Sequence, residues 1–339
     1  MDVIGLRLST HRRYQELAGH LKRQLGTVPL AKLTPAQIGR CYAALQLQPP
    51  PAGKGIPVGG GKQPRALSAT TVHHCHVVFR KALGDAVREG LLARNVATLV
   101  VGAPMPDDFE PTIWTLEQTR TFLAAVRGDR LGALYLLAAC TGMRNGELRA
   151  LRWRDIDLDA AHLQVRQAFQ RGRLHQRQVA GAPKTKASRR RVELPYLAVT
   201  ELRAHRTRQA EERLALGEAW QDATGLIFTS TVGTPLDGVN LLKAFYVLLD
   251  RLGLPRVRLH DLRHLQASLL LAAGVHAKVV AERLGHSHTQ VTLDTYSHVA
   301  AGLQREAADV LDRLFASADE VDEASGEQPA GEDAVERAR

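Results

Sequence analysis

Long apolar runs are absent from this 339-residue sequence, which has no stretch of about 18 apolar residues that could cross a bilayer. We therefore expect neither a membrane span nor a membrane partner. The N-terminus, MDVIGLRLSTHRRYQ, also lacks the apolar segment of a secretory signal, which predicts a cytoplasmic protein. The chain is long enough, at 45% hydrophobic residues, to form two domains.

Cysteine is equally scarce. The three cysteines, Cys41, Cys75 and Cys140, form neither a CxxC pair nor an even set. This pattern argues against a disulfide framework and against a zinc ribbon, and we expect reduced, buried thiols.

Familiar metal-ligand spacings are missing as well. The sequence has no HExxH motif, no Cys/His ligand pair and no carboxylate cluster suited to two metal ions, so we expect no metal and no other cofactor. A zinc site is the alternative interpretation of five histidines in the C-terminal part, namely His260, His264, His286, His288 and His298.

Positive charge is what the chain has in excess. Its formal net charge is +10, but residues 319–339 hold eight acids against two arginines, a net charge of −6, so the remainder carries +16. A body this basic favours a polyanionic partner, because each Lys or Arg that neutralises a phosphate releases a counterion. The alternative is a solvated basic surface. The tail at 317–339 is nearly free of large apolar residues and is predicted to be disordered.

The first hundred residues have the pattern of a small helical unit. Residues 9–46 predict two amphipathic helices, the first ending near Gly26 and the second opening with Thr34-Pro35, a cap followed by proline. A third helix is predicted at 68–88. The Pro- and Gly-rich loop before it carries three basic residues, Lys54, Lys62 and Arg65.

Residues 101–112, rich in proline and acidic side chains, predict a linker to a second domain at 113–316. In that domain the segment LGALYLLAAC (131–140) is apolar almost all round and predicts a buried helix ending at Thr141-Gly142.

Two β-rich pieces follow, at 162–170 and 189–195, and the pattern from 196 to 316 is helical again apart from the short LIFTS segment. The expected fold class is therefore mainly α with a small antiparallel β-sheet (α+β), with a helical domain at 1–100 ahead of the domain at 113–316.

Arg144 appears where the buried helix stops, in TGMRNGEL, and Glu147 follows three residues later. An arginine held on such a support can aim its planar guanidinium at an anion. The alternative is a local surface ion pair between these two residues, which would contribute little to stability.

A basic loop, PKTKAS, lies between the two β-rich pieces and brings Lys184 to a hairpin tip, from which it could enter a groove. Four neighbours add capacity to contact phosphates, namely Lys186, Arg189, Arg190 and Arg191. The alternative is a solvated basic loop.

Two further motifs carry histidine. LHDLRHLQASLLLAAGVH (259–276) predicts a helix with His260 and Arg263 on one ridge and its leucines toward a core. These two basic side chains either form a solvated surface or bind an anionic group together with residues distant in sequence. In LGHSHTQVTLDTYSHV, His286 follows the glycine that ends a helix, and Tyr296 comes ten residues later.

In this order, the motifs around Arg144, Lys184, His260, Arg263, His286 and Tyr296 together resemble the signature of tyrosine recombinases, the phage-integrase family. The resemblance covers about 112–316, and residues 8–97 resemble the helical core-binding domain that precedes it. It implies a site-specific DNA recombinase that is associated with the nucleoid and acts as a homo-tetramer on double-stranded DNA core sites. An accessory or directionality protein would be a further partner.

The resemblance also implies the chemistry. Attack on a DNA phosphodiester puts extra negative charge on the nonbridging oxygens, which fixed cations must stabilise where no metal ions do. Arg144 and Arg263 would clamp the phosphate, with hydrogen bonds from His260 and His286. The other roles follow by analogy: Tyr296 as the nucleophile, Lys184 as the general acid, Glu147 as a supporting residue, and Lys54, Lys62, Arg65, Lys186, Arg189 and Arg190 as DNA contacts.

Two alternatives stay open. A catalytically inactive DNA-binding regulator of the same fold would explain the basic body but not the six motif residues. A type IB topoisomerase would share the phosphotyrosine chemistry.

Overall fold

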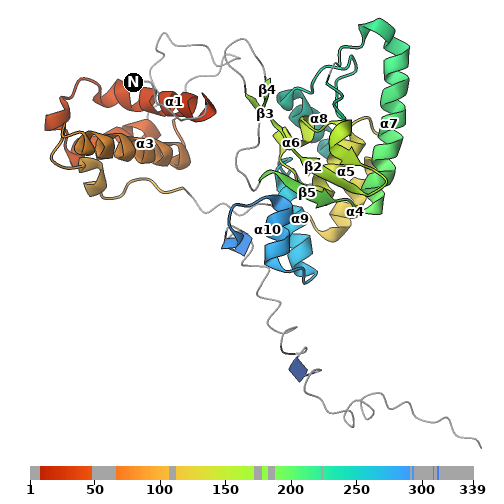
Figure 1. Cartoon of the computed structure of the whole chain (residues 1–339). Helices are drawn as coiled ribbons and strands as arrows, with labels where there is room; N and C mark the ends of the chain where they lie inside the picture. Colours follow the sequence, from red (N-terminus) through yellow and green to blue (C-terminus); the bar gives the residue numbers. More distant parts are fainter. Residues whose placement is uncertain are drawn as a thin grey trace, which may run out of the picture. The chain divides into compact units, whose positions relative to one another are not determined.

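The computed structural model describes residues 8–47, 66–106, 112–171, 178–181, 188–222, 224–290, 292–293, 308 and 311–312 (Figure 1). The chain divides into two compact units, one of residues up to 111 and one from Thr112 onward apart from 170–178. Seven of the residues singled out in the sequence lie outside the described part, namely Lys54, Lys62, Arg65, Lys184, Lys186, Tyr296 and His298.

The first unit is helical, as expected. Its helices are α1 (Leu8–Leu25), α2 (Pro35–Leu47) and α3 (Ala69–Arg88), with short 3-10 turns at Leu30–Lys32 and Val96–Leu99. The apolar faces of the three helices pack into one core, whose largest fully buried side chains are those of Leu17, Ile38 and Tyr42.

The helix starts in this unit follow from local chemistry. The Thr34 hydroxyl accepts from the Gln37 amide at 3.3 Å, while the Gln37 side chain accepts from the Thr34 amide at 2.9 Å. The Ser68 hydroxyl accepts in the same way from Thr71. These side chains satisfy amides that have no partner within the helix, so both predicted helix starts are confirmed.

The second unit contains most of the helices and the sheet. Its helices are α4 (Leu116–Ala125), α5 (Gly132–Thr141), α6 (Asn145–Arg149), α7 (Tyr196–Leu216), α8 (Gly238–Leu252), α9 (Asp261–Ala272) and α10 (Ala277–Leu284). Helix α5 is the predicted buried helix, and it packs against both α7 and α9. In the core, Tyr135 of α5 packs with three further aromatic side chains, those of Trp114, Phe122 and Phe245.

The sheet differs in detail from the expectation. Strands β1 (Ile156–Asp157), β2 (His162–Val165) and β5 (Arg190–Glu193) form an antiparallel sheet in the order β1-β2-β5. The single strand expected at 162–170 is two strands, because the chain leaves this sheet after Val165, where the Gln167 side chain donates to the Ala150 carbonyl.

The second piece, β3 (Ala168–Arg171), pairs instead with β4 (Gln178–Gly181) in a separate two-stranded sheet. Neither β1 nor β4 was predicted. The segment after α7 is less helical than its pattern indicated, since the described residues of 220–237 form no helix. They hold turns and isolated bridges between Arg152 and Leu226 and between Thr229 and Pro235. Among the described helices, none has the length and apolar character needed to cross a bilayer.

Candidate active site

Arg144 lies at the N-terminus of α6, two residues after the glycine that ends α5. Its guanidinium donates to the Glu147 carboxylate at 2.9 Å, and its backbone amide donates to the other oxygen of that carboxylate at 3.0 Å. The Glu147 side chain is only 2% exposed, whereas that of Arg144 is 39% exposed. The alternative of a surface ion pair is therefore wrong, because the acid is buried beneath an arginine that reaches solvent.

Arg190, on β5, is the second partner of Glu147. Its guanidinium donates to the carboxylate at 3.2 Å, and its side chain is 6% exposed. We expected Arg190 to face DNA from a basic loop, but its environment is buried. Its neighbour Arg189 is exposed, and its DNA contact stays a prediction.

The paired arginines decide the charge of Glu147. Burial by itself would raise the pKa of this carboxyl group. The positive charge of Arg190 and the hydrogen bonds and charge of Arg144 outweigh burial, and the pKa is lowered below its ordinary value. Glu147 therefore stays ionised and holds both guanidinium groups.

Helix α9 supplies the next two residues. His260 is its N-cap, and Arg263 lies in its first turn with only 4% of the residue exposed. The Arg263 guanidinium donates to the Gly142 carbonyl at 2.7 Å. The solvated alternative is thus wrong for Arg263, which is directed at the end of α5, while His260 keeps access to solvent.

His286 follows α10, one residue after Gly285, which ends that helix in the left-handed conformation with φ +70°. The Gly285 carbonyl accepts from the Arg144 guanidinium at 3.4 Å, so the turn that carries His286 is tied to Arg144. The Nδ1 atom of His286 lies 2.8 Å from the hydroxyl of Thr292.

Burial and the two arginines together keep both histidines neutral. Partial desolvation of its ring lowers the pKa of His260 to about 4, with further lowering by Arg263, His264 and Arg144. Burial lowers the pKa of His286 to about 4 as well, assisted first by Arg263 and then by Arg144. Both imidazoles are therefore neutral at pH 7, and each has one N–H donor to offer an anion.

Arginines bond to the backbone carbonyls at the ends of both α5 and α10. At the end of α5, Arg283 donates to the Cys140 carbonyl at 2.8 Å, next to the bond from Arg263 to Gly142. At the end of α10, Arg190 donates to the Arg283 carbonyl at 2.6 Å, next to the bond from Arg144 to Gly285. Each helix C-terminus carries partial negative charge, which these guanidinium groups offset.

The structure thus brings together Arg144, Arg263, His260 and His286, with Glu147 and Arg190 behind them. Lys184 and Tyr296 lie outside the described residues, so their place beside this cluster stays a prediction. Sequence reasoning missed Arg283, Gly142 and Thr292. Only Gly142 could be recognised from the sequence, as the predicted end of a helix. Arg283 acts through a contact distant in sequence, and Thr292 acts from a buried position.

A metal site does not form in the described part of the chain, where no three His, Cys, Asp or Glu side chains gather as ligands. Of the five histidines in the zinc alternative, His298 lies outside that part.

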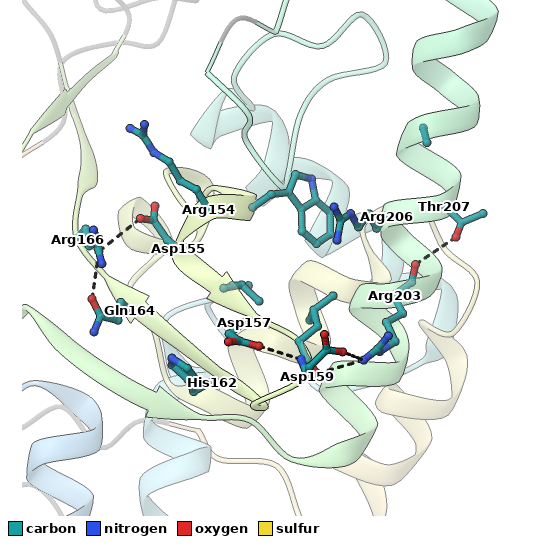
Figure 2. Close-up of a pocket in the computed structure, with 14 residues that line it drawn as sticks. Arg154, Asp155, Asp157, Asp159, His162, Gln164, Arg166, Arg203, Arg206 and Thr207 are labelled. Carbon is teal, nitrogen blue, oxygen red and sulfur yellow. Dashed lines mark hydrogen bonds and ion pairs between the residues drawn. The ribbon is translucent and has the colours of Figure 1, made fainter.

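A separate surface hollow of about 800 Å³ lies between α7 and the β1–β2 side of the sheet. It contains none of the predicted catalytic residues. Figure 2 shows exposed arginines around it interleaved with carboxylates: Arg154, Arg166 and Arg203 with Asp155, Asp157 and Asp159.

Several known proteins are similar to this chain in sequence. A tyrosine recombinase XerC-like protein of Caldanaerobacter subterraneus is 34% identical over 262 residues, covering 73% of this chain and 67% of the relative. An integrase of Streptomyces ambofaciens is 32% identical, covering 74% and 66%, and the ICEBs1 integrase of Bacillus subtilis is 31% identical, covering 74% and 67%. The chain spans about two thirds of the length of these relatives.

Solved structures share the fold. The Tn1549 transposon integrase in complex with transposon right end DNA matches with a TM-score of 0.73 at 19% identity, covering 90% of this chain and 96% of that one. A lambda integrase dimer bound to a COC′ core site matches with a TM-score of 0.58 at 19% identity, covering 87% and 90%. These likenesses establish the mainly helical fold with its small sheet.

The Phage integrase family profile matches residues 115–302, more than half of the chain. This match and the 34% identical relative agree. The chain therefore belongs to the phage integrase family of tyrosine-type site-specific recombinases.

Proposed function

We propose that this chain cuts and rejoins double-stranded DNA at specific sites through a covalent 3′-phosphotyrosine intermediate, with Tyr296 as the nucleophile. The observation that supports this most is the cluster of two arginines and two neutral histidines at the start of α6, the start of α9 and the end of α10. Such a cluster fits a single phosphodiester, which presents two nonbridging oxygens.

The cluster would stabilise the transition state by charge and by directed donors. Arg144 and Arg263 have their guanidinium groups fixed by Glu147 and by the Gly142 carbonyl, so little reorganisation is needed when negative charge develops. His260 and His286 would each donate one N–H to the nonbridging oxygens. With this charge supplied by the chain, the reaction needs neither a divalent metal ion nor ATP.

The proton transfers complete the step. The phenolic oxygen of Tyr296 forms a bond to phosphorus and loses its proton to a neutral imidazole, for which His260 is the candidate. The bond from phosphorus to the 5′-oxygen breaks, and Lys184 protonates the leaving oxygen. The phosphotyrosine is still a phosphodiester, so a 5′-hydroxyl of another strand can reverse the reaction.

The remaining parts of the proposal concern the assembly. The helical unit at 1–100 is the DNA-binding core domain, 101–112 is the linker, and 113–316 is the catalytic domain. Four copies would act on two duplexes in the cytoplasm, at the nucleoid, with an accessory or directionality protein as a further partner. The DNA contacts would come from Lys54, Lys62, Arg65, Lys186 and Arg189.

The test is to trap the covalent complex on a nicked suicide substrate made from DNA that flanks the gene. The full chain should form a protein–DNA adduct, in EDTA as in its absence, and Tyr296→Phe should bind the DNA without forming one. Tyr196→Phe is the matched control, because Tyr196 is 85% exposed at the start of α7, and it should react as the wild type does. An adduct in Tyr296→Phe would refute the nucleophile, and a requirement for a divalent ion would refute the metal-free mechanism.

A further inference from the structure

The imidazole of His286 has a buried partner that the proposed mechanism leaves without a role. Thr292 is fully buried, at 0% exposure, and its hydroxyl oxygen lies 2.8 Å from Nδ1 of His286. The two residues are six apart in sequence, and a buried hydroxyl costs free energy unless it is hydrogen-bonded. A valine would fill the same volume.

The direction of this hydrogen bond determines which ring nitrogen carries the proton. A neutral imidazole has one donor nitrogen and one acceptor nitrogen. Within the described part of the chain, Nδ1 of His286 is the hydrogen-bond partner of the Thr292 hydroxyl, and the hydroxyl can either donate to this nitrogen or accept from it. If Nδ1 were instead the donor, the hydroxyl proton would be buried without an acceptor there, which is costly.

Burial and the charges around the ring keep His286 neutral. Arg263 and Arg144 are both close enough to His286 to lower its pKa, so a second proton on the ring is disfavoured. The ring therefore carries a single proton. With Nδ1 accepting from Thr292, that proton is on Nε2.

We propose that Thr292 is a positioning residue that keeps His286 in the Nε2–H tautomer, so that this N–H is the one offered to the DNA phosphate. This inference rests on the proposed role of His286 in binding the scissile phosphate. In the opposite tautomer Nε2 would present a lone pair to a phosphate oxygen, and one hydrogen bond of the transition state would become a repulsion.

The direct test is to determine the tautomer of His286 by NMR, from the ¹⁵N chemical shifts of its two ring nitrogens in full-length protein with labelled histidine. The His286 signals are assigned by their loss in His286→Gln. At pH 7 the wild type should show a protonated Nε2 and an unprotonated Nδ1. Thr292→Val should show a mixture of tautomers, Thr292→Ser should restore the wild-type pattern, and Thr289→Val, in the same turn, is the matched control.

The functional readout is the rate of adduct formation on the suicide substrate, measured beside the affinity for DNA. Thr292→Val should lower the rate about tenfold, because the hydrogen bond from Nε2 to the transition state is weakened, with little change in affinity. Thr292→Ser should recover most of the rate, which a purely structural role of the methyl group would not predict.

Either a protonated Nδ1 in the wild type or an unchanged tautomer in folded Thr292→Val would overturn the inference. The wild-type spectrum decides even if Thr292→Val does not fold. It needs no DNA, so its outcome is separate from that of the proposed function, which fails if the wild type forms no adduct.

Discussion

The buried carboxylate of Glu147 holds two guanidinium groups of the site at once. It bonds Arg144 at 2.9 Å on one side and Arg190 at 3.2 Å on the other. Removing one partner of a buried ion pair leaves charge in a poorly solvated place, and this costs far more than breaking a surface pair. Glu147 therefore contributes both to stability and to the orientation of Arg144.

Glu147→Gln should lower the free energy of unfolding by about 3 kcal/mol, because Arg190 would be left buried without a counter-charge. Urea denaturation measures this. Glu193→Gln is the control, since Glu193 pairs with Arg191 at the surface and is 63% exposed, and it should change stability by no more than about 0.5 kcal/mol. Equal effects of the two substitutions would show that the burial of Glu147 has no energetic consequence.

The two neutral histidines make stability depend on pH in a defined direction. The pKa of each is about 4 in the folded protein, below the ordinary value of ~6.5 that applies to the unfolded chain. Between these values the unfolded chain binds more protons, so stability is present above pH ~6.5 and is lost as pH falls toward 4.

His286→Gln should flatten this loss by up to about 1.4 kcal/mol per pH unit, the slope that corresponds to one proton. Denaturation series between pH 6.5 and 4 measure the slope for each variant. His288→Gln, at an exposed position two residues later, should keep the wild-type slope. A wild-type slope in His286→Gln would mean that this ring does not take up a proton on unfolding.

At the scale of elements, the site depends on the close fit between the ends of α5 and α10. Gly142 ends α5 with φ +61°, and an added Cβ would lie 2.5 Å from Leu284, the last residue of α10, and 2.9 Å from Gln266 on α9. A side chain here would force the buried Leu284 and Gln266 side chains to move, in the contact that lies between Arg144 and His286.

Gly142→Ala should therefore lower the free energy of unfolding by roughly 3 kcal/mol, from the left-handed backbone and from overpacking together. It should also slow adduct formation. Gly253→Ala isolates the backbone contribution, because Gly253 ends α8 with φ +63° and has nothing within 4 Å of the added carbon; it should cost about 1–2 kcal/mol. If the two variants are equally stable, the contact with Leu284 is not restrictive.

The elements that sequence predicted well are those set by local signals. The caps at Thr34 and Ser68 and the apolar composition of α5 act within one helix, and all three appear as expected. The division of 162–170 into β2 and β3 depends on partners elsewhere in the chain, and two-residue β1 is too short to have a pattern.

Dependence on partners elsewhere in the chain also explains which part of the site could not be predicted from the sequence. Arg263 and Arg190 are buried, although arginine is usually exposed, because carbonyl and carboxylate acceptors come from other elements. Arg263 bonds a carbonyl 121 residues away, and Arg144 bonds one 141 residues away. The motif order indicated which residues belong together; the acceptors that fix them are not readable from spacing.

At the scale of the whole molecule, the net charge of +10 is unevenly distributed along the chain. The hollow beside β1 and β2 shows that arginines alone do not make a phosphate-binding surface, because Asp155, Asp157 and Asp159 alternate with them (Figure 2). Such a surface is nearly neutral and should contribute little to DNA binding.

Replacing Lys54, Lys62 and Arg65 together by Gln should reduce the slope of log affinity against log salt by up to about 3, since each phosphate contact contributes close to one. DNA binding measured over a salt series gives the slope. The matched control replaces three exposed arginines of the hollow, Arg154, Arg166 and Arg203, and should keep it. A reduced slope in the control alone would place the DNA contacts at the hollow.

The bonds from four arginines to the carbonyl ends of α5 and α10 have a consequence for the protein before it meets DNA. Like charges this close would repel one another in an empty site, and the loops would spread. The partial negative charge at the two helix C-termini offsets the charge of the arginines, so the guanidinium groups can lie close together before substrate binds. Because the side chains are already in place, a DNA phosphate can bind with little rearrangement of the pocket. More of its binding energy is then available to stabilise the transition state.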